Sequence, residues 1–147
     1  MGEWVREPAV AGTFYTDDPV RLRGVVQRHL GGGERDETDP PPAALIAPHA
    51  GYRYSGPTAG AGWATLAAAK TTPDRIVLIG PSHRVPVGGS GVGVSSAAAW
   101  RTPLGDVPLD RAGADALVDD GLAVVADDAH APEHSLEVHL PFLLEAL

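Results

Sequence analysis

The sequence predicts an α/β domain in which a mixed or mostly parallel sheet is flanked by helices. Three short apolar runs have the length and composition of buried strands: 43–47, 75–79 and 122–126. Three segments that precede or separate these runs carry helical patterns or compositions: 19–30, 57–69 and 110–120. Strands that alternate with helices are typical of βαβ units, in which neighbouring strands run parallel.

Length and composition narrow the class of protein. The 147 residues suffice for one domain, so residues 1–147 are treated as a single unit. The formal net charge is −8, from 11 basic and 19 acidic residues. Nucleic-acid binding needs clustered Lys and Arg, so we expect no nucleic-acid partner. The sequence contains no cysteine and therefore offers neither a disulfide nor a thiolate ligand.

The sequence shows no sign of membrane insertion or secretion. No apolar run approaches the ~20 residues of a membrane helix, and the start lacks the pattern of a secretory signal. We therefore expect a cytoplasmic protein with no membrane partner. Because the last helical pattern stops at Leu147 without a capping glycine or polar tail, we expect the chain to be the N-terminal portion of a longer protein.

The N-terminal part predicts an ordered segment, a helix and a loop. Residues 8–16, PAVAGTFYT, carry an aromatic pair, and Asp17 or Asp18 can cap a helix at 19–30. The apolar residues of that helix keep the 3.6-residue spacing: Leu22, Val25, Val26 and Leu30. The glycines that follow end the helix, and residues 31–42, GGGERDETDPPP, are expected to form a flexible loop.

The remaining elements follow in alternation. After the strand at 43–47, the small-residue face of the helix at 57–69 is expected to pack closely on the sheet. The strand at 75–79 precedes a Gly-rich stretch that holds a strand near 91–96. Later segments predict a hairpin at 99–108, a helix at 110–120, a strand at 122–126 and a last helix capped by Ser135.

Two histidines follow predicted strands at matching positions. His49 comes just after the run at 43–47 and His83 just after the run at 75–79, 34 residues apart. This separation is close to one βαβ unit, so both imidazoles are expected at the carboxyl ends of parallel strands, facing one crevice. Two histidines with a third ligand and open positions are typical of non-haem Fe(II) sites. Each histidine alone could instead satisfy a loop backbone group.

A third group of polar residues lies at 127–139, DDAHAPEHSLEVH. It contains the HxxEH pattern of one metalloprotease class, but Pro132 disfavours a continuous helix there. We expect Glu133 and His134 to point into the crevice, where the carboxylate can orient the histidine or the two can act as a catalytic acid–base pair. A purely structural Glu–His cap is the alternative.

Five ordered motifs carry a resemblance to a known family: AVAGTFY (9–15), APHAGYRYSG (47–56), GPSH (80–83), WRTPLGDVPLD (100–110) and EHSLEVHLPFL (133–143). The chain resembles the N-terminal half of the Memo family, whose bacterial members are called AmmeMemoRadiSam system protein B. That family is similar in fold to class III extradiol ring-cleaving dioxygenases.

The resemblance implies a metal site and a substrate pocket. His49 and His83 match two metal-binding histidines of the family, whose third ligand is a cysteine in its C-terminal half. Fe(II) is the expected metal, with Cu or Zn as alternatives. Three aromatic residues match family positions that resemble pocket walls: Phe14, Tyr15 and Tyr54. Ser82 is expected to bind substrate together with them.

Two classes of function follow from the resemblance. The first is an oxidoreductase that uses Fe(II) and O2 on a small molecule, associated with AMMECR1-like and radical SAM partners. The second is a binding or adaptor protein that uses the pocket for a peptide or phosphorylated ligand, with Arg53 and Arg84 near the histidines. Metal dependence distinguishes the two, and we expect the 147 residues alone to be inactive as an oxygenase.

Overall fold

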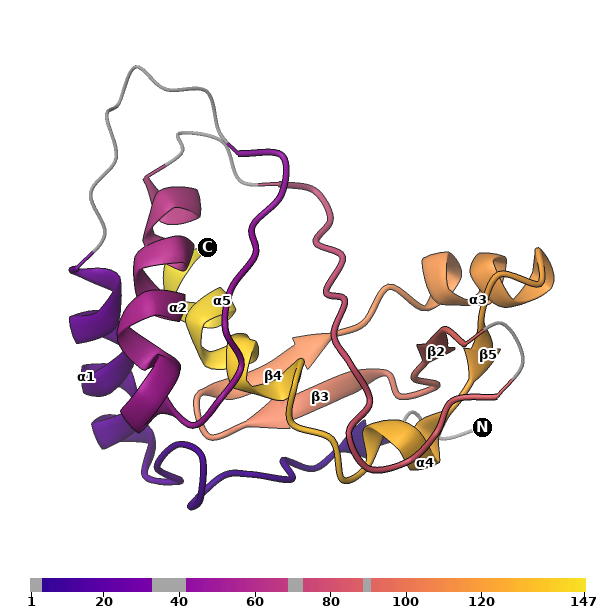
Figure 1. The fold of residues 1–147 in the computed structure, drawn as a ribbon, viewed down its shortest axis with the longest axis horizontal. Helices are drawn as coiled ribbons and strands as arrows, with labels where there is room; N and C mark the ends of the chain where they lie inside the picture. Colours follow the sequence, from indigo (N-terminus) through magenta and orange to yellow (C-terminus); the bar gives the residue numbers. More distant parts are fainter. Residues whose placement is uncertain (1–3, 33–41, 69–72, 89–90) are drawn as a thin grey trace.

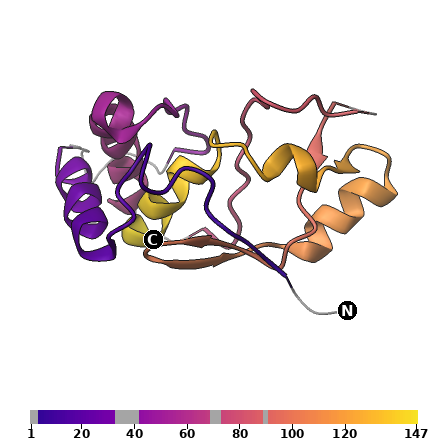
Figure 2. The same cartoon turned by 90° about the horizontal axis from the view of Figure 1, so that it is seen from below.

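The computed structural model describes residues 4–32, 42–68, 73–88 and 91–147 and confirms an α/β fold with small parallel and mixed sheets (Figure 1). Helices α1 (Pro19–Leu30), α2 (Tyr52–Ala67) and α5 (Leu140–Ala146) pack together at one end. The opposite end holds α3 (Arg111–Asp119), β2 (Gly93–Val94) and β5 (Val124–Val125), as Figure 2 also shows. The short helices α4 (Asp127–His130) and η1 (Glu137–His139) connect the two ends.

The described residues form two small sheets. In the first, β1 (Val5–Arg6) runs parallel to β3 (Ala99–Thr102), and β3 pairs antiparallel with β4 (Gly105–Pro108). The β3–β4 pair confirms the hairpin predicted at 99–108. In the second sheet, β2 and β5 pair in parallel.

The local signals predicted α1 correctly and the start of α2 incorrectly. Helix α1 has the predicted bounds, and the Asp18 carboxylate accepts a hydrogen bond from the Arg21 amide at 2.9 Å. Helix α2 begins at Tyr52, five residues before the predicted start, because the buried Tyr52 side chain anchors an additional turn in the core. Among the described residues, none of the helices combines the length and apolar composition needed to cross a bilayer.

The small-residue face of α2 packs against α1, and the prediction that it packs on a sheet is wrong. A Cβ atom added at Gly60 would lie 2.5 Å from Cβ of His29, and one at Gly56 would lie 2.6 Å from Nε2 of His29. A Cβ atom at Gly60 would also lie 2.6 Å from the backbone carbonyl carbon of His29, so glycine at this position allows the two helices to approach. The His29 ring fills the space and also contacts Tyr52 and Phe142.

The predicted strands at 43–47 and 75–79 are not paired. Both segments are extended, but within the described residues neither belongs to a strand ladder. The apolar sequence favours a strand, whereas a ladder also needs a neighbouring strand, and the described chain places none beside them. Most of the predicted loop at 31–42 lies outside the described residues, namely 33–41.

The start of the last helix also differs from the prediction. Ser135 does not cap it: its hydroxyl donates to the Pro81 carbonyl at 2.8 Å, which ties the segment before His83 to this turn. The chain then passes through η1 before α5 begins at Leu140.

The centre of the molecule contains a buried carboxylate, that of Glu137, with no solvent exposure. It accepts hydrogen bonds from the Arg6 guanidinium at 2.6 Å and from the Tyr15 hydroxyl at 2.7 Å. The backbone amides of Ala9 and Val10 donate to it at 2.8 and 3.0 Å. A buried charge is tolerated only when it is paired and hydrogen-bonded, and this network meets both conditions.

We predict that Glu137→Gln lowers the free energy of unfolding by about 3 kcal/mol, because it leaves the buried Arg6 charge unpaired. Urea denaturation followed by circular dichroism measures this change. The matched control is Glu145→Gln, which breaks a pair with the half-exposed Arg23 and should cost less than about 1 kcal/mol. Equal losses in the two variants would contradict a special role for the buried pair.

Candidate metal centre

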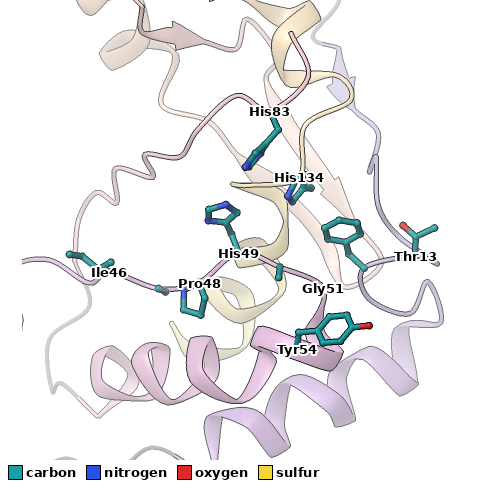
Figure 3. Close-up of a pocket in the computed structure, with 11 residues that line it drawn as sticks. Thr13, Ile46, Pro48, His49, Gly51, Tyr54, His83 and His134 are labelled. Atoms are coloured by element: carbon teal, nitrogen blue, oxygen red, sulfur yellow. The ribbon is translucent and has the colours of Figure 1, made fainter. Parts of the chain in front are cut away.

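Three histidines from distant parts of the chain converge at one point (Figure 3). His49 precedes α2, His83 follows the extended segment at 75–79, and His134 lies between α4 and η1. The ring centroids of His49 lie 5.3 Å from His83 and 5.9 Å from His134, and the rings of His83 and His134 stack at 4.7 Å. One ring nitrogen of each lies within 4.8 Å of the other two, so the group could hold a metal ion.

The structure brings together His49 and His83, the pair that the sequence spacing suggested, and adds His134 to them. His49 and His83 face each other although the segments that carry them are unpaired. His134, predicted to be an acid–base residue, occupies a position equivalent to a third ligand. The role of each histidine stays a prediction.

Glu133 positions His83. Its carboxylate, 5% exposed, accepts hydrogen bonds from the His83 amide at 2.5 Å and from His83 Nδ1 at 3.0 Å. It also accepts from the amides of His134 and Ser135 at 2.8 and 3.0 Å. Because a carboxylate only accepts, His83 carries its proton on Nδ1, which leaves Nε2 as a potential metal ligand.

These contacts also determine the charge of Glu133. Burial by itself raises the pKa of Glu133, but the hydrogen bonds from His83, Ser135 and His134 outweigh it and lower the pKa to about 2. Glu133 is therefore an anion at neutral pH and has no proton to donate. Its predicted catalytic role is not tested, but the geometry suits a residue that orients its neighbours.

His134 has an unsatisfied buried nitrogen. Its Nδ1 lies 3.1 Å from a Glu133 oxygen, but the direction is unsuitable for a hydrogen bond, and the atom has no other partner among the described residues. Burial lowers the pKa of His134, and the nearby His83 and His49 lower it further, against the opposing effect of Glu133. A neutral imidazole is the form that binds metals, so the donor set fits a cation.

The histidines border an open pocket of about 890 Å³. Its walls combine apolar side chains with the three imidazoles: Thr13, Phe14, Ile46, Ala47, Pro48, His49, Ala50, Gly51, Tyr54, His83 and His134 (Figure 3). Phe14 and Tyr54, two of the predicted substrate-binding residues, therefore line the pocket. The ring of Phe14 lies 4.6 Å from that of His134.

Four other residues that were expected to bind substrate or phosphate do not line the pocket. Tyr15 is buried in the core, where its hydroxyl donates to Glu137 and burial raises its pKa. Ser82 is exposed and donates its hydroxyl to the Val85 carbonyl at 2.5 Å. Neither of the arginines considered for phosphate binding lines the pocket: Arg53 and Arg84.

The protease-like pattern does not form a metal site on one helix. Helix α4 ends at His130, and the chain turns through Pro132 before Glu133. His130 points elsewhere, with Nε2 at 3.2 Å from the Gly93 carbonyl. The two histidines of the pattern therefore lie in different environments.

His139, in η1, packs against Trp63 of α2. The Trp63 indole donates a hydrogen bond to Nδ1 of His139 at 3.2 Å. Because indole can only donate, Nδ1 must be unprotonated and the ring is neutral with its proton on Nε2. Burial, with a smaller effect of His49, lowers the pKa of His139 to about 4.

This pairing predicts a pH-dependent stability. Between pH 6.5 and about 4, His139 takes up a proton in the unfolded chain but not in the folded one. The contribution of the neutral ring, on the order of 3 kcal/mol, is therefore complete above pH 6.5 and is lost as the pH falls towards 4. Urea denaturation across this range should show a shallower pH dependence for His139→Gln. Identical slopes for the variant and the unaltered chain would contradict the assignment.

Comparison with known proteins gives the family. Residues 6–147 match the family described as Memo-like protein. A MEMO1 family protein of Methanopyrus kandleri is 48% identical over 147 residues, which cover 94% of this chain and 50% of that protein. One from Methanothermobacter thermautotrophicus is 41% identical over 150 residues, covering 95% and 52%. The chain spans about half the length of the curated relatives it matches, and it belongs to the Memo family.

Proposed function

We propose that this chain supplies the histidine face of a transition-metal site in an oxidoreductase that uses O2 on a small molecule. The convergence of three imidazoles, with Glu133 oriented behind His83, carries the proposal. A metal-binding histidine commonly donates its second ring N–H to a carboxylate, as His83 does. The open pocket beside the imidazoles provides room for a substrate.

The donor set is compatible with several metals. Imidazole nitrogens bind Fe, Cu, Zn and Ni, and Cu(II) generally binds such sites more tightly than Zn or Fe. Fe(II) is our preferred metal because of the resemblance to extradiol dioxygenases, and Cu or Zn are the alternatives. When bound, Fe(II) would bind and activate O2 and would also bind an oxygen atom of the substrate.

The residues of this chain would hold and orient the reactants. Phe14 and Tyr54 provide aromatic walls for an apolar part of the substrate. His134 can bind a metal or accept a proton through a given nitrogen, but not both at once at the same atom. The chain spans about half the length of its relatives, so turnover is proposed for the whole protein. We also propose that this protein is cytoplasmic and that it acts with AMMECR1-like and radical SAM partners.

Removal of single ligands tests the site. We expect His49→Ala, His83→Ala and His134→Ala each to weaken Fe(II) or Co(II) binding by about 100-fold, because each removes one of three donors. Anaerobic isothermal titration calorimetry measures the affinity, and His29→Gln, on α1 outside the cluster, is the control. Unchanged affinity in all three variants would refute the site. Unchanged affinity in His134→Ala alone would remove His134 from the set of ligands.

Glu133→Gln tests the orienting carboxylate. The amide keeps the size of the side chain but loses the charge that faces Nδ1 of His83, so metal affinity should fall by about 10- to 100-fold. Metal titration gives the affinity, and the thermal transition shows that the variant is folded. Glu145→Gln, on α5, serves as the matched control. Wild-type affinity in a folded Glu133→Gln protein would remove Glu133 from the site.

A further inference from the structure

The loops that carry His49 and His83 each contain a backbone carbonyl that accepts a hydrogen bond from a buried serine. The carbonyl of Ala50, which directly follows His49, accepts from the hydroxyl of Ser55. The carbonyl of Pro81, two residues before His83, accepts from the hydroxyl of Ser135. The two serines lie in different parts of the chain, and each contacts the loop of a different histidine.

Ser135 holds the loop of His83 against the turn that carries His134. Its side chain is 1% exposed, and its hydroxyl donates to the Pro81 carbonyl at 2.8 Å. The loop lies close to this turn, since a Cβ atom added at Gly80 would lie 2.9 Å from the Ser135 hydroxyl oxygen. A movement of the loop away from Ser135 would therefore alter the stacking of the His83 and His134 rings, whose centroids are 4.7 Å apart.

Ser55 holds the loop of His49 against the first turn of α2. Its side chain is 7% exposed, and its hydroxyl donates to the Ala50 carbonyl at 2.7 Å. The Tyr52 amide donates to the Phe14 carbonyl at 2.8 Å, which ties the same loop to the N-terminal segment. The backbone on the C-terminal side of His49 is thus hydrogen-bonded to two elements, and the ring centroid lies 5.3 Å from that of His83.

We propose that Ser55 and Ser135 are positioning residues, whose hydroxyls preorganise the imidazoles for metal binding. This inference rests on the proposed metal site. Loss of either hydroxyl leaves a loop carbonyl without its donor, which favours movement of the loop towards another donor. A ligand that is displaced in this way binds a metal less tightly, because partners beyond the ligands determine their orientation. A hydroxyl with only a structural role would change stability and leave the rings in place.

Nuclear magnetic resonance of the metal-free protein tests the positions of the rings. We expect Ser135→Ala to abolish the nuclear Overhauser effects between the rings of His83 and His134. Ser55→Ala should abolish those between His49 and His83, and Ser55→Thr, which keeps a hydroxyl, should restore them.

Thr102→Val is the matched control. Thr102 is 4% exposed, and its hydroxyl donates to the Gly105 carbonyl at 2.9 Å in the β3–β4 hairpin, outside the pocket wall. Its removal also takes a donor from a backbone carbonyl, but it should leave the ring contacts of all three histidines unchanged.

Titration with Co(II) measures the consequence for the site. Each alanine variant should bind Co(II) about 10-fold more weakly than the unaltered protein, and Thr102→Val should bind it equally well. Unchanged ring contacts in folded Ser55→Ala and Ser135→Ala, or an equal loss of affinity in Thr102→Val, would overturn the proposal. If the unaltered protein binds no Co(II), the proposed function fails and the ring contacts alone decide whether the serines position the histidines. If Ser135→Ala lacks a cooperative thermal transition, the comparison of Ser55→Ala with Ser55→Thr decides.

Discussion

The buried ion pair between Arg6 and Glu137 is the interaction on which the remaining structure depends. It joins the first strand to the turn before α5, across 131 positions of sequence, and both side chains are almost fully buried. The same guanidinium donates to the carbonyls of His130 and Glu133 at 2.7–3.0 Å and lies 4.2 Å from the Trp100 ring. Arg6 therefore fixes the turn that carries Glu133 and His134, and thereby part of the candidate metal centre.

Glu133 and Glu137, four residues apart, have different roles because different groups donate hydrogen bonds to them. Glu137 faces a full positive charge and three further donors, which makes it a structural anchor. Glu133 faces backbone amides and an imidazole, so its negative charge remains available to polarise His83. Burial alone would favour the protonated form of Glu133, and the hydrogen bonds donated to it prevent this.

Local signals predicted the fold class and helix α1, but not how the elements pack. The aspartate cap and apolar spacing specified α1, and the 34-residue separation placed His49 beside His83. Long-range partners were not visible in the sequence, which is why the network of Glu137 and the Trp63 contact of His139 were missed. Tyr15 was predicted to line the pocket, but its side chain points into the core. A sequence motif marks an aromatic position but not the direction of its side chain.

The charge of the candidate site indicates what its open side favours. Three neutral imidazoles would leave a divalent ion with its full charge, and the nearest carboxylate, Glu133, contacts His83 through Nδ1 and stands behind the ligands. In a partly buried pocket with apolar walls, an uncompensated cation attracts an anionic ligand strongly. If a metal binds here, the open side, bordered by Ile46, would favour a negatively charged group of a substrate.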